Sequence, residues 1–420
     1  MPTALAYGSY RWLLAGSLLS NFCQWIQQAT IAWVVYDVTG SGALLGAVMS
    51  ARAIPMLLSP LAGVAADRFD RNVLLLVSQI LSALVAAVFG VMLALGAVHT
   101  WHLFAFVLIA GTTAVLDRPT RMTGIFELVP RELAMNAAAI NAIGMSLTRI
   151  VAPALAGFLL GWFDAAGNFA LQGALYVVAG LLALPIVFPR RPAAAQQTSA
   201  WKDLGDGLRF AVRDGTTRLM LFFAALLFIL LLPVWTTVLP VFAKDVFKAG
   251  PQGLGLLLTA GGLGGALGSW AASAMQRFDR QGRVQFVALL VDCASLLGVA
   301  LSPSLPVALA FLAMAGAAEM VIATSIQITL QMAAPDAMRG RVTSLLQLAP
   351  AMMALGALIT GILVELCGAR WATAVLAGVT AMLFIGLYAK SPSLRGLRLS
   401  RFSIPQAGDS PNLSAPFRPE

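Results

Sequence analysis

The chain has 420 residues, of which 59% are hydrophobic and only 11% are charged. A soluble globular domain carries about 25% charged residues, so this composition excludes a soluble protein. The net charge of +9 comes from basic residues in short loops between apolar segments rather than from a basic and aromatic surface stretch, which argues against a nucleic-acid partner.

Apolar runs long enough to cross a bilayer follow one another along the chain. A hydrocarbon core about 30 Å thick requires roughly 20 apolar residues in each helix. Counting such runs predicts an all-α integral membrane fold with twelve transmembrane helices. The spans are expected at 12–36, 42–66, 73–96, 102–126, 136–161, 168–188, 219–243, 251–276, 284–301, 304–332, 342–366 and 370–389.

The distribution of Lys and Arg predicts the orientation of these spans. Short loops rich in basic residues stay in the cytoplasm. With both chain ends in the cytoplasm, the cytoplasmic loops carry most of the basic residues, and the opposite loops carry only Lys244, Lys248 and Arg370. We therefore expect a multi-pass protein with an even number of spans and two cytoplasmic termini.

The longest hydrophilic interior stretch, residues 189–218, separates six spans from six. It predicts an N-terminal bundle at 1–188 and a C-terminal bundle at 219–390. Within this stretch Leu204, Leu208 and Ala211 recur at helical spacing, which indicates an amphipathic helix on the inner membrane surface. The tail at 391–420 is rich in Pro, Ser and Arg, so it is expected to be a disordered cytoplasmic segment.

The two groups of spans share a loop sequence. Arg-Phe-Asp-Arg follows the second span at 68–71 and the eighth span at 277–280, which fits a duplicated six-helix unit. The first copy lies in a loop that resembles the signature of the Major Facilitator Superfamily, in which a Gly (Gly63) and three further residues precede Asp-Arg (Asp67 and Arg68) and a basic cluster. The resemblance covers roughly residues 10–390, and it departs at Asp70, where the superfamily usually has Gly.

Other motifs are similar to one branch of this superfamily. Asp-Arg-Phe-Asp-Arg at 67–71, Ala-Arg-Ala-Ile-Pro at 51–55 and Asp-Arg-Pro-Thr-Arg at 117–121 resemble the enterobactin exporter-like efflux branch, the transmembrane secretion effector family. In the fifth span, residues 152–157 are similar to the glycine-proline motif of proton-coupled exporters, although Ala152 and Ala156 replace glycines. The resemblance implies a secondary transporter of the bacterial inner membrane that works by alternating access.

Two acidic residues inside spans are candidates for proton coupling, because charges are rare and costly in the hydrocarbon core. Glu319 lies in the middle of the tenth span, which lines the central cavity in the superfamily. A carboxylate there can exchange a proton as its surroundings alternate between wet and dry. Asp292 in the ninth span is the second candidate. The alternatives are a structural ion pair for Glu319 and a packing role with Ser295 for Asp292.

A gating role is implied by the resemblance for the loop signature and its neighbours. Asp117 and Arg121 are four residues apart on one helical face. Asp117 is expected to pair with Arg71 or Arg149 as a cytoplasmic gate, or else to form a static pair that neutralises buried charge. The predicted gating set is Gly63, Asp67, Arg68, Arg71, Asp117, Arg121 and Arg149.

Polar side chains inside other spans are expected to line a substrate cavity. Asn21, Gln24 and Gln28 form a stripe on the first span, and amides facing lipid would lack hydrogen-bond partners. Arg52 has no acidic residue within its own span, so it is interpreted either as a contact for an anionic substrate or as structural. Interhelical hydrogen bonds and core packing are the alternatives for the others. The predicted cavity set is Asn21, Gln24, Gln28, Arg52, Trp235 and Gln327.

The residue content argues against an enzyme and against a cofactor. No clustered His, Cys or Ser/His/Asp set occurs at catalytic spacing, and the three cysteines are far apart within apolar segments. The favoured function is proton-driven export of a small organic molecule, such as a siderophore, drug or metabolite, by a monomer. A proton-coupled nutrient importer and a non-transporting membrane receptor remain as alternatives.

Overall fold

The computed structural model describes residues 3–58, 69–189, 200–275, 278–335, 338, 342, 345 and 349–398. The regular elements in these ranges are helices. Eight of the described helical segments are long and apolar enough to cross a membrane. The all-α membrane fold is therefore confirmed, while the number of twelve spans stays a prediction.

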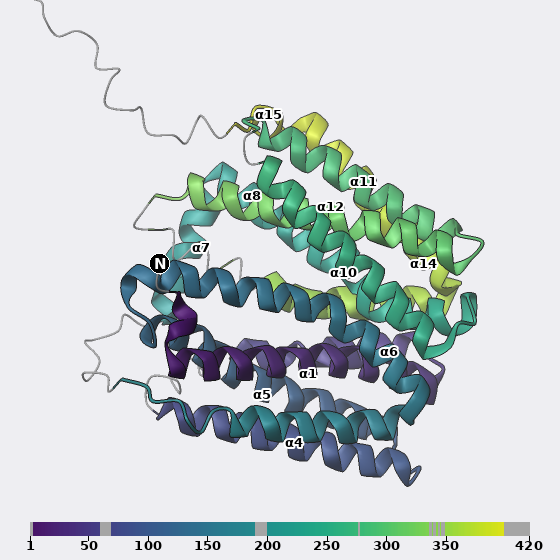
Figure 1. Cartoon of the computed structure of the whole chain (residues 1–420). Coiled ribbons are helices and arrows are strands. Elements are labelled where there is room, and N and C mark those ends of the chain that lie inside the picture. The colour runs from purple at the N-terminus through teal and green to yellow at the C-terminus, as the bar shows by residue number, and fades with distance from the viewer. Residues whose placement is uncertain are drawn as a thin grey trace, which may run out of the picture.

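Figure 1 shows the described helices in chain order. We call residues 3–189 the N-terminal half and residues 200–398 the C-terminal half. The N-terminal half contains η1 (Ala4–Ala6), α1 (Gly8–Thr39), α2 (Gly42–Ala51), η2 (Ile54–Leu58), α4 (Arg71–Ala94), α5 (Thr100–Glu127), η3 (Arg131–Leu133) and α6 (Ala134–Leu181). The C-terminal half contains α7 (Ala200–Arg213), α8 (Gly215–Leu226), η4 (Leu227–Leu231), η5 (Val234–Val238), α9 (Leu239–Val241), η6 (Phe242–Val246), α10 (Gly250–Met275), α11 (Gln281–Leu301), α12 (Leu305–Ala333), η7 (Ala349–Met352), α14 (Met353–Lys390) and α15 (Pro392–Arg395).

Short polar side chains begin several of these helices. The Ser41 hydroxyl accepts the Leu44 N–H at the start of α2, and the Asp214 carboxylate accepts the Thr217 N–H at the start of α8. Asp70, the residue that departs from the superfamily loop signature, caps α4 by accepting the Asn72 N–H at 2.8 Å. Such caps satisfy backbone donors that lack an intrahelical partner. The departure at Asp70 therefore has a local structural role.

Two of the long helices are broken by one residue each. Asp164 in α6 has φ 57° and Gly368 in α14 has φ 78°, and both values lie outside the helical region. An unbroken helix of 48 residues such as α6 would be about 72 Å long, far longer than a bilayer core of about 30 Å. Each break divides its helix into two arms, which overlap the predicted fifth and sixth spans and the predicted eleventh and twelfth spans.

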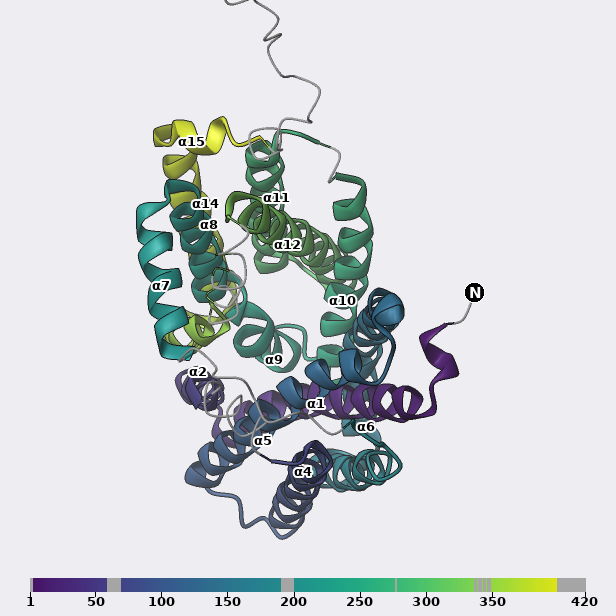
Figure 2. The same ribbon diagram turned by 90° about the vertical axis from the view of Figure 1, so that its left-hand side faces the viewer.

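The two halves meet along two helix pairs. The helices of the N-terminal half gather in the lower part of Figure 1, and Figure 2 shows them as a separate group beside the C-terminal helices. The first arm of α6 crosses α10, where a Cβ added to Gly157 would lie 2.7 Å from the Cα of Gly255. Likewise α2 crosses α14, where a Cβ on Gly46 would lie 2.8 Å from the Cα of Gly361. Glycine allows this close backbone approach. The assignment of the halves to two six-helix bundles stays a prediction.

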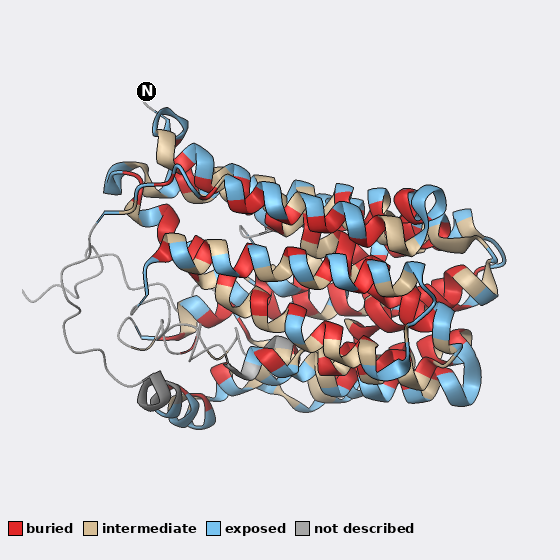
Figure 3. Ribbon diagram, turned by 90° about the horizontal axis from the view of Figure 1, so that it is seen from below, coloured by how far each residue is buried: buried red, intermediate tan, exposed pale blue. Residues whose placement is uncertain are grey.

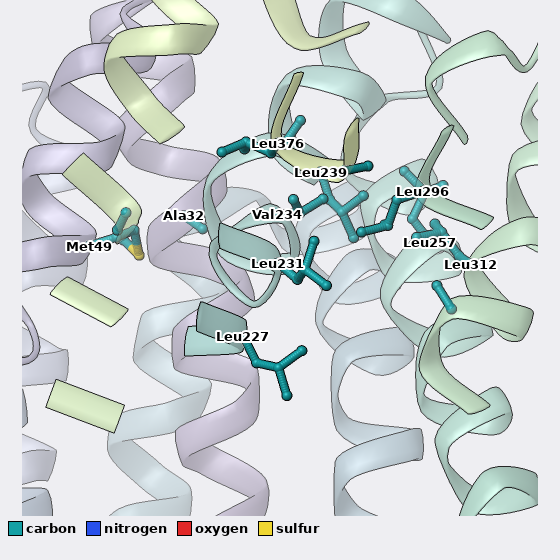
Figure 4. Close-up of a cluster of buried hydrophobic side chains, with 14 of the residues drawn as sticks. Ala32, Met49, Leu227, Leu231, Val234, Leu239, Leu257, Leu296, Leu312 and Leu376 are labelled. Atoms are coloured by element: carbon teal, nitrogen blue, oxygen red, sulfur yellow. The ribbon is translucent and has the colours of Figure 1, made fainter. Parts of the chain in front are cut away.

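Apolar side chains fill the interior and also cover the outside. Figure 4 shows Leu231, Val234 and Leu239 directed toward leucines of the neighbouring helices in one buried cluster. Exposed residues form stripes along the outer faces of the helices (Figure 3), and many of them are large and apolar, such as Ile80 at 61% exposure. An apolar exterior is what a helix needs in lipid.

The predicted surface helix and tail are partly within the described chain. α7 forms where an amphipathic helix is predicted, with Ala211 buried and Leu208 exposed, and its place on the inner membrane surface stays a prediction. Residues 392–395 of the predicted tail form the short helix α15, and Leu394 is fully buried. The remainder of the tail from residue 399 lies outside the described residues.

Candidate transport site

A carboxylate lies in the middle of α12. Glu319 is 14 residues from each end of this helix, so about 21 Å of helix lies on either side of it. The neighbouring Gly316 and Ala318 are buried against other helices, whereas the Glu319 side chain keeps 13% of its surface exposed. The structure therefore places this acid at the midpoint of a helix that is long and apolar enough to cross a membrane, with little of its side chain exposed.

An arginine from the other half of the protein pairs with this acid. The Nη2 atom of Arg149, on the first arm of α6, lies 3.5 Å from Oε1 of Glu319. The same guanidinium contacts the Met320 sulfur at 3.4 Å and lies 5.7 Å from the ring centroid of Trp25 on α1. The Arg149 side chain is 41% exposed. An ion pair and an aromatic contact thus join α1, α6 and α12 across the two halves.

Trp235 reaches the same acid from the irregular helix that follows α8. The segments η4, η5 and η6 are π-helical, and the Leu232 N–H donates to the Leu227 carbonyl five residues earlier. Such widened turns are frequent at functional sites. The Trp235 side chain lies close enough to the Glu319 carboxylate to interact with it. Its ring lies against Gly261 of α10, where a Cβ would be 2.1 Å from the ring, so this position requires glycine.

A second carboxylate completes the cluster. Asp292 on α11 is only 3% exposed and lies within electrostatic range of Glu319. The hydroxyl of Ser295, which the sequence offers as a packing partner for Asp292, donates to the Val291 carbonyl at 2.7 Å. Glu319 therefore has the Arg149 guanidinium as its ion-pair partner and a second acid, Asp292, within electrostatic range. If both are ionised, one negative charge is not balanced, and a single proton or one further cation would neutralise the cluster.

A separate polar network lies inside the N-terminal half. Nε of Arg121 lies 2.9 Å from both carboxylate oxygens of Asp117, which also accept hydrogen bonds from Ser20, Ser78 and Gln79. Both members of the ion pair are 5% exposed.

The remaining predicted gating residues lie elsewhere. Arg71 pairs with Glu127, and Arg149 pairs with Glu319. In this conformation the partner of Asp117 is thus Arg121, which agrees with the static alternative, and the gating role stays a prediction. Gly63, Asp67 and Arg68 lie outside the described residues.

The predicted cavity residues are distributed over several places. Asn21 donates a hydrogen bond to Thr148, which ties α1 to α6, while Gln24 and Gln28 are half-buried. Arg52 lies at the end of α2 near Tyr176, away from the Glu319 cluster, and is also half-buried. Gln327 lies on α12, eight residues beyond Glu319, and is exposed. Of this set the structure brings only Trp235 into contact with Glu319.

Comparison with known proteins identifies the family. Residues 3–404 match the family of transmembrane secretion effectors, which are transporters of the Major Facilitator type. The chain belongs to this family. It is therefore a multi-pass membrane transporter and not an enzyme.

Several similar proteins are transporters that the chain matches over most of their length. It is 24% identical to the staphyloferrin A transporter of Staphylococcus aureus, over 85% of this chain and 90% of that protein. It is 25% identical to the multidrug efflux pump Tap of Mycolicibacterium fortuitum, over 92% of this chain and 97% of that protein. The solved nucleoside transporter NupG shares the fold, with a TM-score of 0.74 and 18% identity, over 91% of this chain and all of that one.

Polar contacts join the two halves at the end where α1 stops. Lys244 on η6 lies 2.6 Å from Asp37, and Tyr36 donates a hydrogen bond to Asp245. On the neighbouring side, the Glu365 carboxylate of α14 accepts the Ser41 hydroxyl at 2.9 Å and the Ala43 N–H at 3.2 Å. We call these contacts the outer latch, because the predicted orientation of the spans places this end outside the cytoplasm.

Proposed function

We propose that this chain exports a small organic molecule by alternating access, driven by inward proton flow. The carrying observation is the Arg149–Glu319 ion pair, which joins the two halves near the midpoint of α12. Ionisable residues inside membrane spans are costly and commonly mark substrate or ion pathways, which supports the proposal. The multidrug efflux pump and the siderophore transporter among the relatives support a drug, siderophore or related metabolite as substrate.

The geometry suggests how a proton and a change of access are linked. Protonation of Glu319 removes its attraction for Arg149, which loosens the contact between the first arm of α6 and α12. In this proposal residues 1–188 and 219–390 then rock as two bundles around the cluster, and the outer latch opens. Glu319 and Asp292 carry the proton, while the half-buried or exposed polar residues Gln24, Gln28 and Gln327 line the route. We further propose a monomer in the bacterial inner membrane with both termini in the cytoplasm.

Inverted membrane vesicles test both direction and coupling. An exporter moves its substrate into such vesicles, so an imposed gradient with an acidic interior should drive accumulation of at least one member of a panel of labelled drugs and siderophores. A protonophore should abolish this accumulation, and vesicles without the protein should show none. Accumulation confined to right-side-out vesicles with an acidic exterior would instead identify an importer.

A disulfide across the outer latch tests alternating access. Ser41→Cys combined with Glu365→Cys, in a Cys367→Ser background, places two thiols where the native side chains are in hydrogen-bond contact. Oxidation should stop transport because α2 and α14 can no longer separate at this end, and a reductant should restore it. Each single-cysteine variant, treated with the same oxidant, serves as the control. Undiminished transport by the fully cross-linked protein would refute alternating access around this latch.

A further inference from the structure

The Arg149 guanidinium occupies a place with the chemistry of a cation-binding site. The Glu319 carboxylate lies 3.5 Å from it, and the Trp25 ring lies 5.7 Å from it. A second indole, Trp235, also lies close enough to interact with the carboxylate. A carboxylate combined with an indole face is the arrangement by which proteins bind organic cations. Here the cation is supplied by the protein itself.

At this site the acidic side chains are buried, whereas the basic side chain is partly exposed. Glu319 and Asp292 are largely buried, with 13% of the Glu319 side chain and 3% of Asp292 exposed, so both acids are held in place by the surrounding helices. Arg149 is 41% exposed on a long flexible side chain, and its 3.5 Å contact exceeds the roughly 2.7–2.9 Å of a strong charged hydrogen bond. The guanidinium is therefore freer to move than the two acids.

We propose that Arg149 is a tethered substitute for the substrate, and that the substrate is an organic cation with an aromatic or other bulky apolar body. This inference rests on the proposed transport function. In the substrate-free protein Arg149 balances the Glu319 carboxylate. A substrate cation displaces it, and a proton on Glu319 displaces either cation. Because one carboxylate serves three competing partners, substrate and proton exclude each other, as exchange transport requires.

The charged groups on the helices around Glu319 favour a cationic substrate. The charged groups that face Glu319 are Arg149 from α6 and Asp292 from α11, with the Cys293 thiol beside Asp292. α10, which packs along α12, has no charged residue. An anionic substrate would need to bind Arg149 beside two buried acids and would be repelled by them. The balance of fixed charge therefore favours a cation.

Equilibrium binding of two matched probes tests the assignment without any gradient. Tetraphenylphosphonium and tetraphenylborate have nearly the same shape and opposite charge. The purified full chain in lipid nanodiscs should bind the labelled phosphonium at pH 8.5, where few protons compete, and bind it less tightly as the pH falls. The borate should not bind at this site.

If Arg149 competes with the substrate cation, removing Arg149 and removing the Glu319 charge should change phosphonium binding in opposite directions. Arg149→Gln removes the internal competitor and should tighten phosphonium binding about two- to fivefold, as expected for the loss of a partly exposed ion pair. Arg149→Lys keeps a competing cation and should bind like the wild type. Glu319→Gln should weaken binding at least about tenfold, because a charged partner is lost. Arg118→Gln, which removes an exposed arginine of the same half, should have no effect.

The outcome separates this inference from the proposed transport cycle. Weaker phosphonium binding by folded Arg149→Gln protein, or borate binding that Arg149→Gln abolishes, would overturn the assignment of a cation site. The comparison of Arg149→Gln with Arg149→Lys is sufficient on its own. The test therefore remains valid even if the Glu319→Gln protein does not fold. Binding without proton-driven accumulation in vesicles would refute the proposed cycle but leave the cation site intact.

Discussion

Glu319→Gln is expected to uncouple transport from the proton gradient. The amide keeps the size of the side chain, but it cannot exchange a proton. Accumulation in inverted vesicles under an imposed gradient should fall by about 5- to 150-fold, the range that coupling free energies of about 1–3 kcal/mol produce. Downhill movement of substrate at saturating concentration should continue, because the neutral amide, like a protonated carboxyl group, does not hold Arg149 and leaves the two halves free to rock.

The matched control for this change is Glu132→Gln. Glu132 is an exposed acid in the short connection before α6, so the same substitution there should leave accumulation unchanged. A Glu319→Gln protein that still accumulates substrate in response to the gradient would exclude Glu319 as the coupling acid. Asp292→Asn would then be the next variant to measure, because Asp292 is the other carboxylate of the cluster.

Local sequence spacing predicted the contacts that lie within one helix. The apolar runs located the long helices, and the four-residue spacing of Asp117 and Arg121 predicted their ion pair. The sequence analysis missed Ser20 and Gln79, which also bind Asp117. Gln79 could have been found, because it is an amide inside an apolar span, as Gln24 is.

Contacts between distant helices could not be predicted in the same way. Arg149 and Glu319 were each singled out because a charge in a span is rare, but their pairing depends on how α6 and α12 cross, which no spacing along the chain reveals. The π-helical turns that position Trp235 are likewise set by packing against α10, where Gly261 leaves room for the ring. The sequence does not predict the non-helical backbone of Asp164, because this residue has φ 57° without being a glycine.

Asp117→Asn is expected to produce the largest loss of stability in the N-terminal half. The change leaves the Arg121 guanidinium with no counter-charge while 5% of its side chain is exposed. Its two terminal nitrogens have no hydrogen-bond partner among the described residues, so Asp117 is its main source of stabilisation there. Breaking a buried pair by removing one partner costs about 3–5 kcal/mol. The free energy of unfolding, measured by denaturant titration in detergent micelles, should fall by about this amount.

Two further variants decide whether the loss arises from the unpaired charge. Asp117→Leu combined with Arg121→Met replaces both charges by apolar side chains and should recover most of the stability, because a buried pair contributes little net free energy over apolar packing. Lys244→Gln breaks the partly exposed pair with Asp37 and should cost no more than about 1 kcal/mol. If the double variant were as unstable as Asp117→Asn alone, the hydrogen bonds from Ser20, Ser78 and Gln79, rather than the charge on Arg121, would account for the role of Asp117. The static interpretation of this pair would then need replacement by one in which the whole network is the stabilising unit.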